Sequence, residues 1–420
     1  MGKKEIKNSF WMISEKIISI FGLIFVTSFV AKYVGPGIYG QIALATTLFQ
    51  IVQVVAQLGS EVIIFKRVSK NSSSGVKLIH STVSIRFLIY IIVSIPILLY
   101  FLYHSEGGSV LYVSAAAVSC LFTSLDVYSI YFDAKLQSKT NTMVNIFGLV
   151  VSLLLRALIA IFKLNPLYLC IPIILTSLIP YILRRFQFKR LHGNFRLNFR
   201  YKKKYTKYIL VAGSNLVISS LSVAIYPRLA VIMLGYYQSA EQVGILSVAA
   251  TLAGSWAFVC NSVITSFLPS IFSEKDNYIA LLKASKLNII VLILVFPVIA
   301  MIICFGNYFI FLLYGESYIK SYNPLIILSI ATCVSLLGTI SARFIAKYSG
   351  YSFLSKKMFF VTIVSLSLNY ILINSYGVMG AAYATLTTEI ISLTILNYFY
   401  KSGIIAKLHF MTVTIQPFLV

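Results

Sequence analysis

Charged residues are scarce in this chain, and acidic residues are the scarcest among them. Only 11% of the 420 residues are charged, and 11 Asp and Glu stand against 35 Lys and Arg. A soluble domain carries about 25% charged residues, whereas 59% of this chain is hydrophobic. The composition therefore excludes an ordinary soluble domain and predicts an integral membrane protein.

Cysteine and histidine are also rare, with five and four residues respectively. The cysteines all lie in apolar segments without paired spacing, which argues against a disulfide framework and a metal site. The chain has no P-loop motif for nucleotide phosphates. Its match to G-x-G-x-x-G, from Gly35 to Gly40, follows a long apolar helix rather than a strand. We therefore interpret that match as a tight turn between helices.

Twelve apolar segments are long enough to cross a bilayer as helices, which takes about 20 residues. They lie at residues 9–32, 41–64, 78–102, 109–132, 141–162, 166–183, 208–233, 243–270, 286–313, 322–344, 357–375 and 380–400. The loops on the expected outer side are short. We therefore expect an all-α polytopic membrane protein with about 12 transmembrane helices.

The most basic stretch, residues 184–207, carries ten Lys or Arg and no acidic residue. Short loops rich in Lys and Arg stay on the cytoplasmic side of a membrane. With this connector and both termini inside, 27 of the 35 cations are cytoplasmic. A nucleic-acid patch is another interpretation of such a run, but it needs a soluble face, so we expect no nucleic-acid partner. The expected organisation is an N-terminal six-helix bundle (1–183), the connector (184–207) and a C-terminal six-helix bundle (208–420).

Polar residues recur at helical spacing in four spans, which places each set on one helix face. The sets are Gln50, Gln53, Gln57 and Glu61; Asn145, Gly148, Ser152 and Arg156; Asn215, Ser219, Ser222 and Tyr226; and Thr332, Ser335, Thr339 and Arg343. Packing and hydrogen bonding between helices would account for any single set. Four sets in both halves favour a shared aqueous cavity of the kind found in transporters.

Five cations lie inside the expected spans: Lys16, Arg86, Arg156, Arg228 and Arg343. Each costs about 2.5–3.5 kcal/mol to insert, so we interpret them as candidates for binding an anionic substrate, such as a phosphate or an acidic sugar. Lys16 and Arg343 are near enough to the cytoplasmic ends to snorkel instead. Glu15, Glu61 and Asp126 are candidate ion-coupling carboxylates or ion-pair partners of these cations.

Short motifs spread over nearly the whole chain point to one family. They are Asn8-Ser9-Phe10-Trp11 with Glu15-Lys16, Tyr33-Val34-Gly35-Pro36 with Tyr39-Gly40, Tyr226-Pro227-Arg228 with Ile232-Met233-Leu234-Gly235, Leu313-Tyr314-Gly315-Glu316-Ser317-Tyr318, and Tyr376-Gly377-Val378-Met379-Gly380-Ala381. Together they resemble Wzx-type polysaccharide repeat-unit flippases of the multidrug/oligosaccharidyl-lipid/polysaccharide exporter superfamily. The resemblance implies two six-helix bundles around a cationic cavity. It also implies translocation of undecaprenyl-diphosphate-linked oligosaccharides, of the O-antigen or capsule type, across the bacterial inner membrane.

We therefore expect a transporter rather than an enzyme, working by alternating access, with the lipid-linked oligosaccharide and the bilayer as partners. Polymerase and chain-length proteins of the same pathway are further candidate partners. No cofactor is expected apart from H+ or Na+ as candidate coupling ions. Many relatives carry an acidic residue two positions after the arginine of the seventh span, where this chain has Ala230. The alternatives are a drug or small-molecule antiporter of the same fold, which should show carboxylates in its cavity, and a membrane glycan polymerase, which should have a sizeable outer loop.

Overall fold

The computed structural model describes residues 3–104, 107–193 and 199–415, and the regular structure within these ranges is entirely helical. The chain forms two compact units, Met1–Ala224 and Ile225–Val420, which we call the N-terminal unit and the C-terminal unit. The division between them falls inside the expected seventh span. The connector expected at 184–207 begins within a helix.

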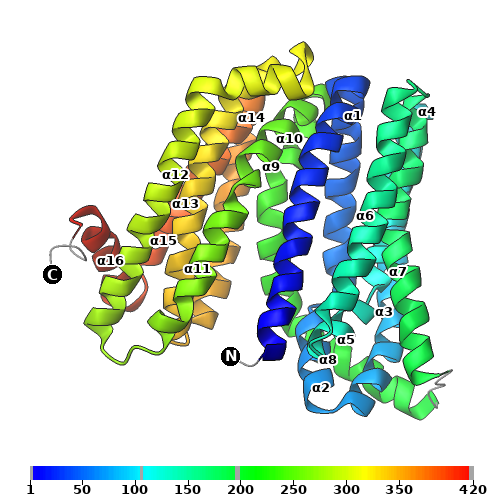
Figure 1. Ribbon diagram of the computed structural model, residues 1–420, viewed down its shortest axis with the longest axis horizontal. Coiled ribbons are helices and arrows are strands. Elements are labelled where there is room, and N and C mark those ends of the chain that lie inside the picture. Colours follow the sequence, from blue (N-terminus) through cyan, green and yellow to red (C-terminus); the bar gives the residue numbers. More distant parts are fainter. Residues whose placement is uncertain (1–2, 105–106, 194–198, 416–420) are drawn as a thin grey trace. The chain divides into compact units, whose positions relative to one another are not determined.

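The N-terminal unit is a bundle in which α1, α4, α6 and α7 pack against one another (Figure 1). Its elements are α1 Lys3–Gln57, α2 Ser60–Lys70, α3 Ser72–His104, α4 Gly107–Leu125, α5 Tyr128–Ala134, α6 Ser138–Ile161, the 3-10 helix Pro166–Leu169, α7 Cys170–His192 and α8 Phe199–Ile225, whose last residue belongs to the C-terminal unit.

The C-terminal unit is built around α13, which packs against α10, α12 and α14. Its elements are the 3-10 helix Tyr226–Arg228, α9 Leu229–Tyr237, α10 Ala240–Ser255, α11 Ala257–Phe272, α12 Asn277–Tyr314, the 3-10 helix Glu316–Ser321, α13 Tyr322–Lys347, α14 Tyr351–Leu393, α15 Ile395–Tyr398, the 3-10 helix Lys401–Gly403 and α16 Ile404–Val413.

Two elements, α1 and α14, are each a pair of helical arms joined at a glycine. A continuous helix of 43 residues, the length of α14, would be about 65 Å long, twice the roughly 30 Å hydrocarbon core of a bilayer. Gly35 and Gly377 interrupt them with φ of 75° and 55°, a region that glycine adopts without steric cost. A Cβ on Gly380 would lie 1.9 Å from the carbonyl oxygen of Leu372. The chain therefore reverses direction tightly around Gly377.

The helices agree with the expected spans. Nine helical stretches of the described residues are long and apolar enough to cross a membrane. The helices α1 and α14 each cover most of two expected spans, and α8 with α9 covers the expected seventh span. The expectation of an all-α polytopic membrane protein is confirmed. The sequence did not reveal α16, a ten-residue apolar helix that packs on α12.

Candidate functional site

Arg184 is the centre of a buried network in the N-terminal unit. Its guanidinium forms an ion pair with Asp126, which lies in the break between α4 and α5, and the two side chains are only 5% and 8% exposed. The Nε of Arg184 donates to Asn141 Oδ1 at 3.0 Å, and Nη2 donates to Asn145 Oδ1. The network therefore connects α6 and α7 to the α4–α5 break.

The two asparagines extend this network to further elements. The Nδ2 of Asn145 donates to Glu15 on α1 at 2.6 Å, and the Nδ2 of Asn141 donates to Asp133 on α5 at 2.8 Å. A buried charge is tolerated only when it is paired and hydrogen-bonded. The sequence predicts Arg184 to be the first residue of a cytoplasmic connector. The structure instead buries it inside the bundle, where its partners compensate its charge.

Arg86 is a second buried cation of this unit, with a relative exposure of 1%. Its Nε and Nη2 donate to the Ser60 hydroxyl at 3.1 and 2.7 Å, and Nη1 donates to the Ser124 carbonyl at 2.9 Å. Every guanidinium nitrogen is thus engaged by the protein. An anionic substrate would have to displace these bonds to reach Arg86, so a role in substrate binding stays a prediction.

Arg156, on α6, differs from both. It is half-buried, and it forms no hydrogen bond or ion pair with the residues that the structure describes. Its charge is therefore not compensated in the way that the charges of Arg86 and Arg184 are. The role of Arg156 in binding an anionic substrate stays a prediction, and its guanidinium is not engaged by the described residues as that of Arg86 is.

The remaining predicted cations have varied settings. Arg228 is half-buried and ends the 3-10 turn Tyr226–Arg228, which breaks the helix at Pro227. Arg343 is exposed on α13, which fits the snorkelling alternative. The side chain of Lys16 lies outside the described part of the chain, as do those of Asn215 and Ser219.

The polar set on α6 packs against α7. A Cβ on Gly148 would lie 2.8 Å from the Pro180 side chain. Ser152 is buried, donates to the Pro172 carbonyl at 2.9 Å and accepts from Thr176 at 2.7 Å. For Gly148 and Ser152 the structure supports interhelical packing and hydrogen bonding, the alternative to a water-filled cavity. Gln50, Gln53 and Gln57 are half-buried on the second arm of α1, and their lining role stays a prediction.

The structure also places the three candidate coupling carboxylates in different surroundings. Asp126 forms an ion pair, but with Arg184 rather than with one of the five predicted cations, and Glu15 is half-buried against Asn145. Glu61 is exposed. Within the described residues, no group of three or more His, Cys, Asp or Glu is arranged to hold a metal ion.

A polar cluster in the C-terminal unit brings together two members of the predicted polar sets, Tyr226 and Ser335, around an acid that none of the sets contained. The Tyr226 hydroxyl donates to Glu389 on α14, and Ser335 on α13 bonds to the same carboxylate. Lys357, also on α14 and 7% exposed, donates to Asn397 on α15 at 2.9 Å. None of the predicted polar sets contained Glu389, and Lys357 is the first residue of an expected span. The proximity of Glu389 and Lys357 depends on how α14 and α15 fold. The spacing of residues along a single helix does not reveal this.

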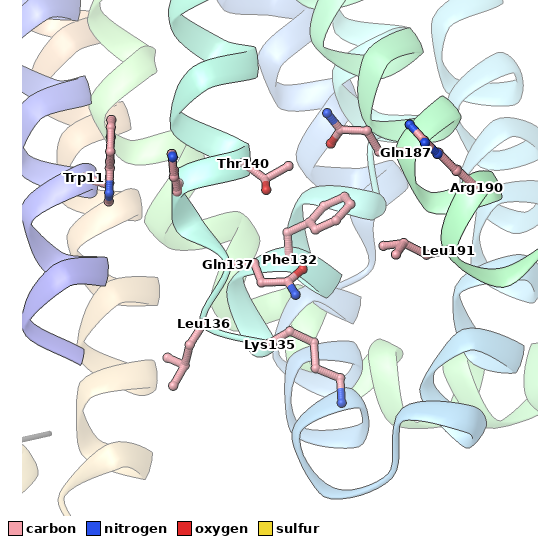
Figure 2. A pocket seen from close by; sticks show the side chains of 10 residues that line it. Trp11, Phe132, Lys135, Leu136, Gln137, Thr140, Gln187, Arg190 and Leu191 are labelled. Atoms are coloured by element: carbon pink, nitrogen blue, oxygen red, sulfur yellow. The ribbon is translucent and has the colours of Figure 1, made fainter. Parts of the chain in front are cut away.

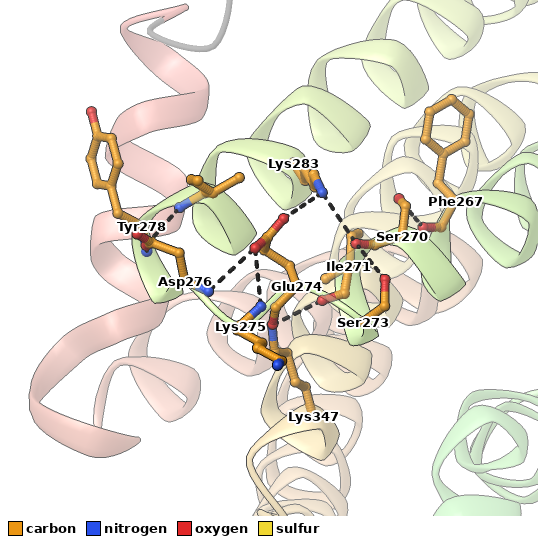
Figure 3. Close-up of polar contacts among 11 residues, drawn as sticks. Phe267, Ser270, Ile271, Ser273, Glu274, Lys275, Asp276, Tyr278, Lys283 and Lys347 are labelled. Carbon is orange, nitrogen blue, oxygen red and sulfur yellow. Dashed lines mark hydrogen bonds and ion pairs between the residues drawn. The ribbon is translucent and has the colours of Figure 1, made fainter.

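A second cluster joins the turn between α11 and α12 to α13 (Figure 3). Lys283 donates to the Glu274 carboxylate at 2.7 Å, and Lys347 donates to the Glu274 carbonyl at 2.7 Å. The hydrogen bond from Lys283, followed by that from the backbone N–H of Asp276, lowers the pKa of Glu274 below its usual value. Asp276 also caps α12 by accepting from Tyr278 N at 2.7 Å. This cluster stabilises the turn between α11 and α12, and it lies outside the expected spans.

Comparison with known proteins relates this fold to membrane transporters. Residues 6–275 match the model of a family described as polysaccharide biosynthesis protein. No curated protein sequence matches the chain. Among solved structures, the chain is similar to the lipid II flippase MurJ in an inward closed conformation, with a TM-score of 0.67 and 15% identity over 99% of this chain and 92% of that one.

The chain is also similar to a multidrug resistance MATE family transporter of the MOP superfamily. For its inward-facing conformation the TM-score is 0.63 at 15% identity, over 94% of this chain and 99% of that one. For an outward-facing conformation the TM-score is 0.61 at 15% identity, with 97% and 96% covered. At such identities the similarity shows a shared fold.

Proposed function

Because the chain belongs to the family of polysaccharide biosynthesis proteins, we propose that it is a flippase for undecaprenyl-diphosphate-linked oligosaccharide repeat units. It would move O-antigen or capsule repeat units from the inner to the outer leaflet of the bacterial inner membrane, with both termini cytoplasmic. The fold shared with a lipid II flippase over 99% of this chain supports this proposal. Polymerase and chain-length proteins of the same pathway would receive the product.

The observation that carries the proposal is that the described residues leave the guanidinium of Arg156 without a hydrogen bond or ion pair. A cation inside a span costs about 2.5–3.5 kcal/mol to insert, and the described residues offer Arg156 no hydrogen bond or ion pair to offset this cost. A guanidinium presents paired N–H donors that match the oxygens of a phosphate. The side chain is therefore suited to the diphosphate of the proposed substrate, whereas a site for cationic drugs would require an unengaged carboxylate.

The charge of the substrate also supplies a driving force. A diphosphate carries roughly two negative charges, and moving each outward across an inside-negative membrane gains about 2.3 kcal/mol per 100 mV. Alternating access of the two units would let the head group cross while the lipid tail stays in the bilayer. Ala230 is buried in α9 where many members of the resembled family carry an acid. Coupling to H+ or Na+ would then assist export without being obligatory.

The test uses cells that lack their own copy of the gene and depend on the introduced protein for surface glycan. Arg156→Ala should reduce glycan display at least tenfold, and Arg156→Lys should restore it only in part, because an ammonium cannot bind two phosphate oxygens as a fork does. Lys320→Ala is the matched control, since Lys320 is exposed in the 3-10 helix Glu316–Ser321. Normal display by Arg156→Ala, at a membrane level equal to wild type, would refute the role of Arg156.

A further inference from the structure

The N-terminal unit contains a pocket that is distinct from the intramembrane arginines. It has a volume of about 750 Å³ and lies among α1, α5, α6 and α7 (Figure 2). Lys135, Leu136 and Gln137 on its wall form the turn between two membrane-spanning stretches, Gly108–Ala134 and Ser138–Ile161. The pocket therefore lies where spans end, at the depth of lipid head groups in a bilayer.

The charge of this pocket is positive. Lys135, Lys139 and Arg190 line it, and none of its lining residues that the structure describes is acidic. The nearest acid along the chain, Asp133, already accepts hydrogen bonds from Ser138 and Asn141 at 3.1 and 2.8 Å. The pocket thus concentrates three cations without an acidic counterpart in its wall, which favours an anion.

Two further polar features face the same space. The pocket includes the start of α6, where Gln137 provides no side-chain cap, and the first turn of a helix favours negative charge. The Gln187 amide oxygen on α7 is buried without a hydrogen bond to the described residues. Because an amide can be turned around, this side chain could donate to a phosphate or accept from a neighbouring hydroxyl.

The apolar part of the pocket indicates an amphiphile. Trp11, Phe132 and Leu191 line it beside the cations, and the Lys139 ammonium lies 5.5 Å from the centre of the Trp11 ring. From Lys139, an exposed apolar stripe of Met143, Phe147 and residues 150 and 154 continues along α6, since positions three and four apart share a helix face. A head group at Lys139 would have its acyl chains along this stripe.

We propose that this pocket binds the phosphate of an anionic membrane lipid, with its chains along α6. The lipid is either a bulk phospholipid or the polyprenyl diphosphate that carries the glycan, and both present the same phosphate chemistry. The site goes beyond the proposed function, because it would hold a lipid at the membrane surface whether or not that lipid is transported.

The chain offers its own reporter for this site. It has only two tryptophans, and Trp256 lies in the other unit, so Trp256→Phe leaves Trp11 as the single fluorophore. In liposomes, phosphatidylglycerol brominated on its acyl chains should quench Trp11 at least twofold more than equally brominated phosphatidylcholine. The variant Lys135→Gln/Lys139→Gln/Arg190→Gln should abolish this difference. The control Lys66→Gln/Lys70→Gln/Lys189→Gln, which removes three exposed cations that do not line the pocket, should keep it.

Competition then identifies the source of the phosphate. Recovery of fluorescence on adding a small fraction of undecaprenyl diphosphate would identify the carrier lipid, and displacement only by excess unbrominated phosphatidylglycerol would identify the bulk lipid. Either result supports the proposal. Equal quenching by the two brominated lipids, a difference that survives in the pocket variant, or displacement by inorganic diphosphate alone would overturn it. None of these readouts depends on glycan transport, so failure here is distinguishable from failure of the proposed function.

Discussion

Asp126 in the N-terminal unit is joined to a cation in an ion pair, whereas Glu389 in the C-terminal unit is held without one among the described residues. Arg184 pairs with Asp126, and asparagines from α6 take its other donors. Glu389 instead bonds to the hydroxyls of Tyr226 and Ser335, and no ion pair joins it to Lys357 in the described part of the chain. Lys357 bonds to Asn397.

This difference distinguishes a carboxylate that stabilises the fold from a carboxylate that can gain and lose a proton. Neutralising Asp126 would leave a buried guanidinium without its counter-charge, so this carboxylate is suited to holding helices together. A carboxylate held only by hydroxyls can gain a proton without breaking an ion pair. We therefore expect any H+ or Na+ coupling to involve Glu389 rather than Asp126.

The largest expected effect comes from breaking the ion pair. Asp126→Ala should destabilise the protein by about 3–5 kcal/mol, because it leaves Arg184 buried and unpaired. Thermal unfolding of the purified protein in detergent measures this as a lowered Tm. Asp126→Leu combined with Arg184→Met removes both charges and should recover much of the loss. If Asp126→Ala alone were as stable as wild type, the ion pair would not contribute to the stability of the fold.

A smaller effect is expected at the corresponding acid of the C-terminal unit. Glu389→Gln keeps a side-chain oxygen that can accept from the Tyr226 hydroxyl, and it breaks no ion pair. The expected change in stability is about 1 kcal/mol or less, measured in the same unfolding assay. A loss as large as that of Asp126→Ala would remove the distinction between the two units.

The smallest effect should come from the Glu274–Lys283 pair outside the spans. Because the folded-state pKa of Glu274 is lowered by Lys283, the pair stabilises the fold above the ordinary glutamate pKa of about 4.3. This contribution is lost as the pH falls through the folded-state value. The Tm of Glu274→Gln should lie slightly below wild type at pH 7, and the two curves should converge in acid. A constant difference across this range would contradict the assignment.

Apolar length and glycine placement were enough to predict most of the fold. The turns at Gly35 and Gly377 fall between expected spans, because a bilayer limits helix length and a reversal needs a permissive backbone. The partners of Arg184 could not be predicted in this way. Asp126 and Asn141 are 58 and 43 residues away from it, and only helix packing brings them together.

Spacing on one helix also could not distinguish a cavity from a packed face. The polar set on α6 predicted a lining, yet Gly148 and Ser152 pack against α7. Both uses place small polar residues on one helix face. What separates them is the neighbour opposite, here Pro180 and Thr176 on α7, and the periodicity of one helix contains no information about it.

The central claim is that the protein itself moves a lipid-linked glycan across a bilayer. The most direct measurement places purified protein in liposomes with a fluorescently labelled undecaprenyl-diphosphate oligosaccharide and follows its exposure to an impermeant quencher. We predict that wild-type protein moves the head group faster than protein-free liposomes do, and faster still when the leaflet it leaves faces the negative side of an imposed potential without a pH gradient. Arg156→Ala should lose most of this rate. A rate in wild-type liposomes equal to that of protein-free liposomes at every potential would contradict the account.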